Sequence, residues 1–322
     1  MTSSPALRDM AVGRKATESI AGIVVSYFPD DEFSHRIQKL STQVDHIIVV
    51  DNGSKGYLES KLRDCSSLIK ELISNEKNLG VAHALNSGVE CARRLSVKWV
   101  ATFDQDSEVG PDYRVKMMHA WNSLIDTHDI ALLAPAYVYA SLGQTRSDST
   151  EPRLISQETP REIRTVMTSG NVVPCSTFDR VGPYRADFII DYVDHEFCFR
   201  CRRAGLHIFE VPDLALAHNL GRIERTKLGP LSATVTHHSP MRRYFITRNR
   251  LCTWREHGIR NWQWTLGDMI GSMKEMLKIV MFESEKTKKS VAAFFGVLDA
   301  IRGRMGWGSS SRFQPVHRET KK

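Results

Sequence analysis

Short apolar runs alternate with stretches of helical spacing through the first hundred residues. The runs predict strands at 20–26, 46–50, 69–74 and 98–103. The segments between them predict helices at 33–44, 57–68 and 81–94. Nearly continuous apolar strands that alternate with helices are typical of a parallel sheet covered by helices on both faces. The pattern therefore predicts an α/β fold.

The pattern changes after residue 107. It predicts helices at 112–127 and 195–204 and strands at 130–139, 163–168 and 206–211. Residues 141–160 are polar and predict a loop, and only helices are expected from residue 240 onward. We therefore expect a flexible N-terminal tail (1–19), a main domain (20–238), a C-terminal helical extension (239–305) and a flexible tail (306–322).

Polar residues gather where the predicted strands end. They lie at 27–29, 51–54, 78–80 and 104–106. In open α/β sheets, ligands bind outside the carboxyl ends of the strands. We therefore expect these four segments to form one site.

Asp104 and Asp106 lie two residues apart at the end of an apolar strand. Side chains two apart on an extended segment point to the same face, and like charges that close raise each other's pKa. A divalent cation, bound by carboxylate oxygens, phosphates and water, would remove the repulsion. A shared proton, or a capping role for the helix that begins near residue 112, is the alternative.

Charge and cysteine content narrow the partners. The 322 residues include 44 Lys and Arg against 37 Asp and Glu, a net charge of +7 that favours an anionic partner. The basic residues are dispersed, so we expect no nucleic-acid partner. Six scattered cysteines suit a reducing cytosol, and we expect Cys198 and Cys201 to pack inward. Without a signal peptide or a bilayer-length apolar run, a cytoplasmic location is expected.

Four motifs in a fixed order carry a family resemblance. They are G-I-V-V-S-Y-F-P (22–29), V-V-D-N-G-S (49–54), N-L-G-V-A-H-A-L-N-S-G (78–88) and F-D-Q-D-S (103–107). Together they resemble the nucleotide-binding half of the family 2 inverting glycosyltransferases with the GT-A fold, and the likeness spans about residues 20–250. The F-D-Q-D-S form and R-R-Y-F-I-T-R-N-R (242–250) resemble bacterial rhamnosyltransferases in particular.

The resemblance implies a mostly parallel central sheet flanked by helices, with a nucleotide-binding half at about 20–107 and an acceptor half at about 108–238. It also implies a metal-dependent transfer using Mg²⁺ or Mn²⁺. The donor would be dTDP-L-rhamnose or another dTDP or UDP sugar. The acceptor would be a glycan or lipid-linked oligosaccharide in the biosynthesis of a bacterial surface polysaccharide such as the O-antigen of lipopolysaccharide.

Individual roles follow from the resemblance at the strand ends. Tyr27 and Pro29 would flank the nucleotide base. Asp51, followed by Asn52, would accept a hydrogen bond from the imide N–H of thymine or uracil, although an Asx turn explains it equally well. The segment with Asn78, Gly80 and Asn86 would approach ribose and phosphate. Asp104 and Gln105 would face the ribose or sugar, and Asp106 would bind the metal.

The resemblance implies a catalytic base at Asp194, in D-Y-V-D-H-E (191–196). An inverting transfer needs one base that removes the proton of the acceptor hydroxyl. Asp191 and Glu196 remain alternatives, and all three acids also suit a helix N-terminus.

Other segments would complete the site. Ser169, Gly170 and Asn171 would shape the pocket for the donor sugar and acceptor. His218 would contact the metal or diphosphate, although a structural role is open. Arg243 and Arg248 would contact the diphosphate, unless their helix only presents a solvated basic face.

Residues 262–282 carry apolar side chains at spacings of three and four, which predicts an amphipathic helix. It would lie on an anionic membrane, at the cytoplasmic face of the inner membrane, or pack on the domain or on a second copy in a homo-oligomer. Two other classes remain for the whole chain. One is a haloacid-dehalogenase-type phosphatase, which carries its D-x-D on the first strand; the other is a non-catalytic nucleotide- or nucleic-acid-binding protein.

Overall fold

The computed structural model describes residues 19–139, 144–145, 159–218, 223–228, 231–236 and 238–313, with side chains for 19–137, 159–216 and 238–313. The chain divides into two compact units. Unit 1 comprises Met1–Tyr184 and Phe197–Asn219, and unit 2 comprises Arg185–Glu196 and Leu220–Lys322. Each unit is described by itself.

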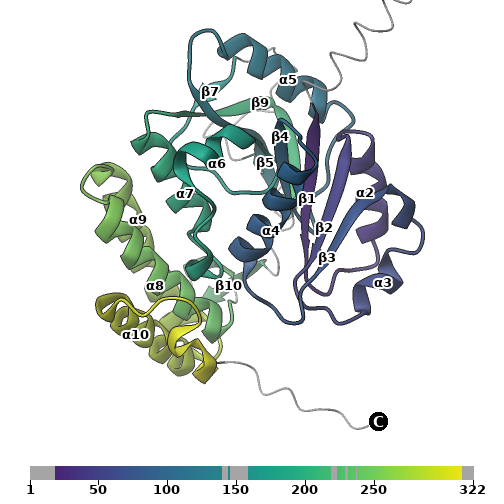
Figure 1. The fold of residues 1–322 in the computed structure, drawn as a ribbon. Coiled ribbons are helices and arrows are strands. Elements are labelled where there is room, and N and C mark those ends of the chain that lie inside the picture. The colour runs from purple at the N-terminus through teal and green to yellow at the C-terminus, as the bar shows by residue number, and fades with distance from the viewer. Residues whose placement is uncertain are drawn as a thin grey trace, which may run out of the picture. The chain divides into compact units, whose positions relative to one another are not determined.

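Unit 1 is built around a nine-stranded sheet (Figure 1) in the order β3-β2-β1-β4-β8-β5-β9-β7, with β6 paired to β5. Its strands are β1 (Ile20–Ser26), β2 (His46–Asp51), β3 (Ile69–Ser74), β4 (Trp99–Asp104), β5 (Ile130–Tyr139), β6 (Gln144–Thr145), β7 (Arg161–Glu162), β8 (Asn171–Pro174) and β9 (His207–His218). The first four strands are parallel, as predicted, and β5 is parallel to β9. Strand β8 runs antiparallel between β4 and β5 and was not predicted.

The helices of unit 1 connect these strands. They are α2 (Phe33–Ser41), α3 (Tyr57–Lys61), η1 (Ser66–Leu68), α4 (Val81–Arg94), α5 (Tyr113–Leu124), α6 (Cys175–Val181) and the part of α7 (Val193–Arg203) from Phe197 onward. The chain steps outward from β1 to β2 and β3, and then returns to place β4 on the other side of β1. With right-handed crossovers, α2 and α3 therefore lie on one face and α4 on the other. The connections thus reverse direction between β1 and β4, where open sheets bind ligands.

Close packing of α4 on β1 depends on a glycine. A Cβ added to Gly88 would lie 2.3 Å from Cγ2 of Ile23, well inside van der Waals contact. The strands beneath are almost fully buried and apolar, because helices cover both of their faces. This packing fixes the strand ends that carry the site.

The strand predicted at 163–168 is wrong. Of its described backbone groups, only the N–H of Ile163 bonds to a neighbouring strand, at the carbonyl of Ile208 (2.9 Å), and the carbonyls further on bond to side chains and a loop. The carbonyl of Thr168 accepts hydrogen bonds from Thr102 Oγ1 (2.6 Å) and from the N–H of Asn171 (3.3 Å). The carbonyl of Met167 accepts bonds from Asn171 Nδ2 (2.7 Å) and the Tyr137 hydroxyl (3.0 Å). The strands instead lie on either side, as β7 and β8.

Unit 2 is mainly helical. It contains η2 (Ala186–Phe188), the first turn of α7, the hairpin β10 (Ile223–Leu228) and β11 (Leu231–Thr236), α8 (Pro240–His257), α9 (Trp262–Phe282), α10 (Lys286–Arg302) and η3 (Gly308–Phe313). Ser239 caps α8, since its Oγ accepts the N–H of Arg242 at 3.2 Å, and Pro240 suits the first helical position. The hairpin was not predicted, whereas the helices after residue 240 are confirmed.

The core of unit 2 extends into the segment expected to be a flexible tail from residue 306. Tyr244 and Phe245 on α8 are fully buried, and they pack with Ile189, Trp307 and Phe313. Residues up to 313 therefore belong to the folded unit, and residues 314–322 lie outside the described part.

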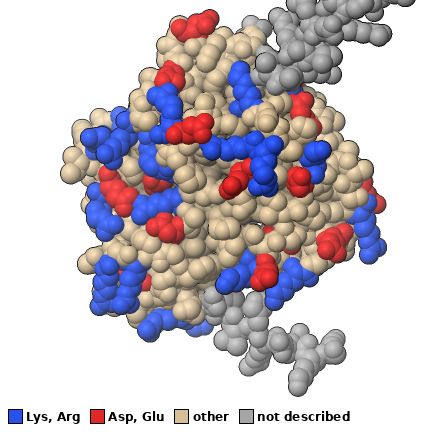
Figure 2. All heavy atoms as spheres, viewed as in Figure 1, with Lys and Arg blue, Asp and Glu red and all other residues tan. Residues whose placement is uncertain are grey.

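Cys198 and Cys201 are buried, as expected, and the six cysteines are free thiols. Acidic and basic side chains are interspersed over the face shown in Figure 2. Among the described residues, no helix is long and apolar enough to cross a membrane.

Candidate active site

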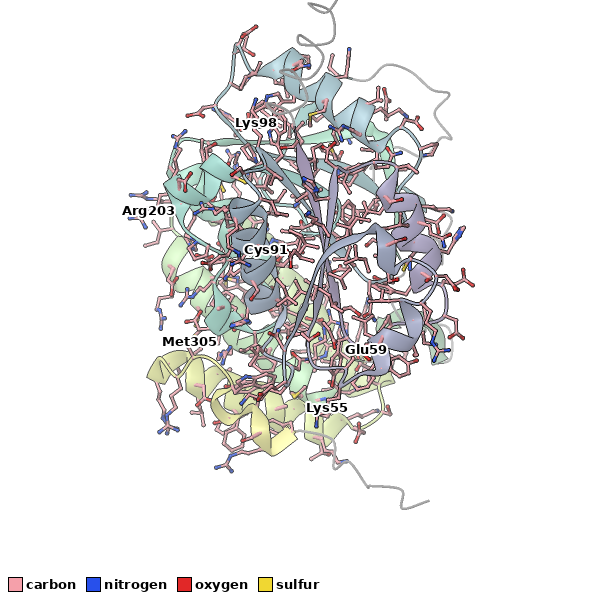
Figure 3. The ribbon with its side chains drawn as sticks, turned by 45° about the vertical axis from the view of Figure 1, so that its right-hand side comes forward. Lys55, Glu59, Cys91, Lys98, Arg203 and Met305 are labelled. Atoms are coloured by element: carbon pink, nitrogen blue, oxygen red, sulfur yellow. The ribbon has the colours of Figure 1, made fainter. Side chains whose placement is uncertain are left out.

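The loops that follow β1, β2 and β4 are tied together at one edge of the sheet. Figure 3 marks this edge by Lys55 and Glu59, after β2, and the opposite edge by Lys98, which precedes β4. The N–H of Tyr27 donates to Gln105 Oε1 at 2.7 Å, and the N–H of Phe28 donates to Ser54 Oγ at 2.9 Å. Three of the predicted strand ends therefore form one rigid edge.

Asn52 joins the fourth segment to this edge. Its side-chain nitrogen donates to Asn78 Oδ1 (3.0 Å), and its oxygen accepts the N–H of Leu79 (3.0 Å). Asn78 Oδ1 in turn accepts the N–H of Gly80 at 2.9 Å. Asn52 and Asn78 were predicted to contact a nucleotide, and the structure uses their amides to hold the loop that leads into α4. The two asparagines therefore position the loop from Asn78 to Gly80.

Gly53 allows the same close approach. Its φ of +102° is in the region that favours glycine, and an added Cβ would lie 2.5 Å from the backbone carbonyl carbon of Lys77. The D-N-G-S motif thus requires its glycine for loop packing.

Asp51 is buried at the end of β2, and its Oδ1 accepts the N–H of Ser54 at 2.9 Å. The carboxylate thus makes a local turn bond to the backbone three residues on, one residue further than in the Asx turn of the alternative explanation. A single N–H occupies one oxygen of the carboxylate, which has further lone pairs to accept another donor. The turn and the predicted base recognition are compatible.

An exposed aromatic cluster lies beside Asp51. Tyr27, Phe28 and Tyr57 are 43%, 49% and 41% exposed. The rings of Tyr27 and Phe28 meet edge to face with centroids 4.8 Å apart, and those of Phe28 and Tyr57 lie 5.5 Å apart. Phe28 and Tyr57 were missed in the sequence, although Tyr57 stands only three residues after D-N-G-S. Exposed aromatic faces of this kind can stack on a planar base.

Asp104 ends β4 and is adjacent to β1, since it pairs in register with Val25. The N–H of Asp104 donates to Ser169 Oγ at 3.1 Å, and Ser169 Oγ lies 2.6 Å from Ser107 Oγ. Asp104, Gln105 and Asp106 are all partly exposed. The paired aspartates and the predicted 169–171 segment therefore lie together, as the sequence suggested.

The 169–171 segment is fixed from both sides. The N–H of Gly170 donates to the carbonyl of Thr102 (2.5 Å), and its carbonyl accepts the hydroxyl of Tyr113 (2.9 Å). Gly170 has a φ of +76°, and an added Cβ would lie 2.8 Å from Leu216 and Pro135. Asn171 Oδ1 is buried and, within the described residues, has no hydrogen-bond partner. Asn171 Oδ1, on a segment that lies beside the aspartates, is thus an acceptor that no described residue uses.

The donor set at the end of β4 fits a hard divalent cation. Two carboxylates two residues apart, beside two serine hydroxyls, supply only oxygen atoms, which Mg²⁺ and Mn²⁺ prefer. In the described part of the chain, no group of three or more His, Cys, Asp or Glu gathers to hold a metal by itself. Two carboxylates suit an ion that shares its remaining positions with phosphate and water. The side chain of His218, the predicted third contact, lies outside the described residues.

Asn86 does not join this edge through its side chain. Its Nδ2 donates to the carbonyl of Tyr184 and its Oδ1 accepts the N–H of Tyr184, both at 2.8 Å. Through these two bonds the amide of Asn86 attaches α4 to the backbone of Tyr184. The predicted contact of Asn86 with ribose is therefore not supported.

In unit 2, the segment before Asp194 has a strained backbone. Ile189, Asp191 and Tyr192 have φ values of 65°, 62° and 65°, which are uncommon for residues other than glycine. Asn249 holds this segment, since its Nδ2 lies 2.8, 2.8 and 3.0 Å from the carbonyl oxygens of Phe188, Ile190 and Asp191. The R-N-R part of the basic motif thus positions the start of α7.

The three candidate bases differ in their contacts. Asp191 forms a two-point ion pair with Arg242, at 3.1 and 3.0 Å. Glu196 is buried, and its Oε1 lies 3.7 Å from Nε2 of His257. Asp194 is partly exposed, and its Oδ1 accepts the N–H of His195 at 2.8 Å. Among the three, Asp194 is the partly exposed acid for which no ion pair is observed within the described part of the chain.

Arg243 and Arg248 are not placed to bind a diphosphate. Arg243 is 3% exposed and pairs with Glu275 and with Glu283 (3.2 Å). Burial alone would raise the pKa of Glu275, but Arg243 and Arg250 hold it below its ordinary value. Arg248 is fully buried and donates to the carbonyls of Gly306 and Asp187. Both arginines are engaged inside unit 2, Arg243 with two carboxylates and Arg248 with backbone carbonyls.

Comparisons with known proteins identify the class. The structure resembles that of GalNAc-T7 with UDP, GalNAc and Mn²⁺, with a TM-score of 0.53 and 13% identity; the match covers 75% of this chain and 49% of that one. It also resembles residues 1–349 of TarS from S. aureus, with a TM-score of 0.55 and 12% identity, covering 89% of this chain and 82% of that one. These likenesses show the fold, which is that of the GT-A glycosyltransferases.

The sequence comparisons go further. Residues 31–183 match the family model of glycosyl transferase family 2. The chain is also 25% identical over 299 residues to "dTDP-rhamnosyl transferase RfbF" of Shigella flexneri, covering 90% of this chain and 98% of that protein. The match of residues 31–183 to the family model and the similarity to a rhamnosyl transferase together show that the protein is a glycosyltransferase. The phosphatase alternative is wrong, as is the non-catalytic one.

Proposed function

We propose that the protein is an inverting, metal-dependent rhamnosyltransferase that uses dTDP-L-rhamnose as donor. The observation that carries the choice of donor is the similarity to the dTDP-rhamnosyl transferase of Shigella flexneri, which extends over 90% of this chain. The geometry at the ends of β1, β2 and β4 supports a nucleotide at that edge of unit 1.

Asp51 and the aromatic cluster of Tyr27, Phe28 and Tyr57 recognise the base. A carboxylate accepts the imide N–H of thymine, and an exposed ring stacks on its face. Pro29 restricts the backbone conformation of the loop after β1. The loop from Asn78 to Gly80, held by Asn52, brings backbone groups to the ribose and phosphate. These assignments explain why a buried acid lies next to exposed aromatic rings.

Asp106 holds the cation, and Asp104 and Gln105 face the ribose or sugar. When bound, Mg²⁺ or Mn²⁺ stabilises the negative charge that develops on the departing nucleoside diphosphate. Ser169 and Ser107 keep the backbone of Asp104 in place through the bonds described above. Gly170 and Asn171 line the side where the sugar lies.

Asp194 is the base. Its carboxylate takes the proton of an acceptor hydroxyl while that oxygen forms a bond to the anomeric carbon and the bond from this carbon to dTDP breaks. A single displacement of this kind inverts the anomeric configuration. The ion pair of Asp191 and the burial of Glu196 favour Asp194 for this role. The acceptor is a glycan or lipid-linked oligosaccharide of a bacterial surface polysaccharide.

A donor screen tests this function. Purified protein with Mn²⁺ and an acceptor extract is given dTDP-L-rhamnose, dTDP-glucose, UDP-glucose and GDP-mannose, and release of free nucleoside diphosphate is measured. We expect turnover with dTDP-L-rhamnose and a loss of at least about 100-fold in Asp194→Asn, with dTDP binding unchanged. Asp213→Asn, an exchange of the same kind on β9, serves as control. Turnover of another donor in preference, or full activity of Asp194→Asn, would contradict the proposal.

A further inference from the structure

Helix α9 presents an exposed apolar face. Seven of its side chains are between 43% and 72% exposed: Trp262, Leu266, Met269, Ile270, Met273, Leu277 and Val280. At about 100° per residue they fall within an arc of roughly 100°, and they extend over most of a helix about 30 Å long. Single exposed apolar residues are ordinary, but a continuous row of this length marks an interaction surface. We call these seven residues the α9 apolar face.

The charged residues of α9 are sorted by sign. Its two acids point into unit 2. Asp268 accepts hydrogen bonds from the Tyr192 hydroxyl (2.9 Å) and Trp254 Nε1 (2.8 Å). Glu275 pairs with Arg243 and with Arg250. The exposed side chains of α9 are therefore apolar, neutral (Gln263) or positive, and none is acidic.

Lys274 and Lys278 are exposed and lie four residues apart. On the helical wheel Lys274 lies about 40° beyond one edge of the α9 apolar face, and Lys278 lies about 40° further round on the same side. Two lysines beside an apolar row, with no exposed acid on the same helix, complement a surface that is apolar inside and negative outside. A bilayer with anionic headgroups has that composition.

We propose that the α9 apolar face lies in the interface of an anionic membrane, with Lys274 and Lys278 at the headgroups. The charge pattern disfavours a second copy as the occupant. Two such faces packed on one another would bring lysines together without an exposed acid from either α9. The proposal concerns a surface of unit 2 and stands apart from the donor specificity proposed above.

Vesicle sedimentation tests the proposal. Full-length protein is mixed with vesicles of phosphatidylcholine alone or of equal parts phosphatidylcholine and phosphatidylglycerol, and the bound fraction is measured at low and high salt. We expect binding to the anionic vesicles that weakens with salt. Fluorescence of Trp262 should also shift to the blue on those vesicles, and the shift should be smaller in Trp262→Phe.

Two variants separate the contributions. Met273→Gln with Leu277→Gln should weaken binding at least about tenfold. Lys274→Gln with Lys278→Gln should weaken binding to anionic vesicles roughly 30-fold, at about fivefold per lysine. All four residues are exposed, so neither variant disturbs the core. Val115→Gln and Lys70→Gln, at exposed positions of unit 1, are the matched controls and should bind like the parent protein.

Failure of the protein to bind anionic vesicles would overturn the proposal. Equal binding by the parent and both double variants would do the same. A third contrary result is a dimer in sedimentation equilibrium that Met273→Gln with Leu277→Gln dissociates, without vesicle binding by the parent. That result would assign the face to a second copy.

Discussion

Asn249 offers the sharpest test of how unit 2 holds the segment before Asp194. Asn249→Ala removes the amide that lies within 3.0 Å of three backbone carbonyls. It also removes the oxygen that accepts Arg248 Nε at 3.0 Å. The carbonyl of Phe188 keeps a second donor, Arg248 Nη2 at 3.4 Å, so the loss falls mainly on the carbonyls of Ile190 and Asp191.

Each buried polar group left without its partner costs about 1–3 kcal/mol. Asn249→Ala leaves two carbonyls and one guanidinium N–H without a partner, so at about 1 kcal/mol each the total cost is about 3 kcal/mol. The strained residues at 189, 191 and 192 would also be free to relax, which offsets part of the loss and displaces the start of α7. We therefore expect the free energy of unfolding to fall by about 3 kcal/mol and sugar transfer to fall at least about tenfold, with dTDP affinity unchanged.

Urea unfolding followed by tryptophan fluorescence measures the first effect, since Trp254, Trp262, Trp264 and Trp307 lie in unit 2. Asn261→Ala is the control, because its amide donates to a single carbonyl, that of His257 at 3.0 Å. That variant should lose no more than about 1 kcal/mol. Equal stability of the two variants would refute the role assigned to Asn249.

Two further predictions concern other parts of the chain. Gly53→Ala should lower the free energy of unfolding by at least about 3 kcal/mol and weaken dTDP binding, because the new Cβ meets the backbone of Lys77. Gly56→Ala, with a φ of +81° but open space around the Cβ, should lower it by only about 1 kcal/mol. Equal losses in the two variants would refute the packing role of Gly53. Burial, with Arg242 and Arg243 nearby, lowers the pKa of His238 to about 4 from its ordinary 6.5. As the pH falls, His238 gains a proton in the unfolded chain before it does so in the folded one, so its contribution to stability is full above about pH 6.5 and is lost toward pH 4. Between pH 7 and pH 4.5, the free energy of unfolding of His238→Gln should fall by about 2 kcal/mol less than that of the parent, as measured by urea unfolding. The same pH dependence in both proteins would contradict this.

Most strands of the parallel half were predictable because both of their faces are covered. Ile20–Ser26 has the predicted bounds, since a buried strand is an apolar run whatever it packs against. Ile69–Ser74 also has the predicted bounds, although it is an edge strand with mostly exposed residues. Strand β8 has only four residues, and its partners β4 and β5 are distant in sequence, so local pattern does not reveal it. The β10–β11 hairpin had a signal in Gly229-Pro230 between two alternating segments, which was overlooked.

In the site, sequence motifs located the right segments but not every role within them. Asp51, Asp104 and Ser169 come together because strand ends of one sheet share an edge. The reciprocal bonds of Asn86 with Tyr184 join residues 98 positions apart, which spacing alone cannot predict. A run of basic residues likewise has the same sequence pattern whether its side chains face solvent or are buried. The acids that neutralise Arg243 lie 32 and 40 residues further on.

The proposed transfer requires a cation held at Asp106 together with a nucleoside diphosphate. Calorimetric titration of dTDP with and without Mn²⁺ tests it most directly, on the parent protein, on Asp106→Asn and on Asp112→Asn, an exposed acid paired with Lys116. We predict that Mn²⁺ tightens dTDP binding at least about tenfold in the parent and in Asp112→Asn, and has no effect in Asp106→Asn. Affinity for dTDP that is the same with and without Mn²⁺ in the parent, or an unaltered Mn²⁺ effect in Asp106→Asn, would contradict a cation site at Asp106.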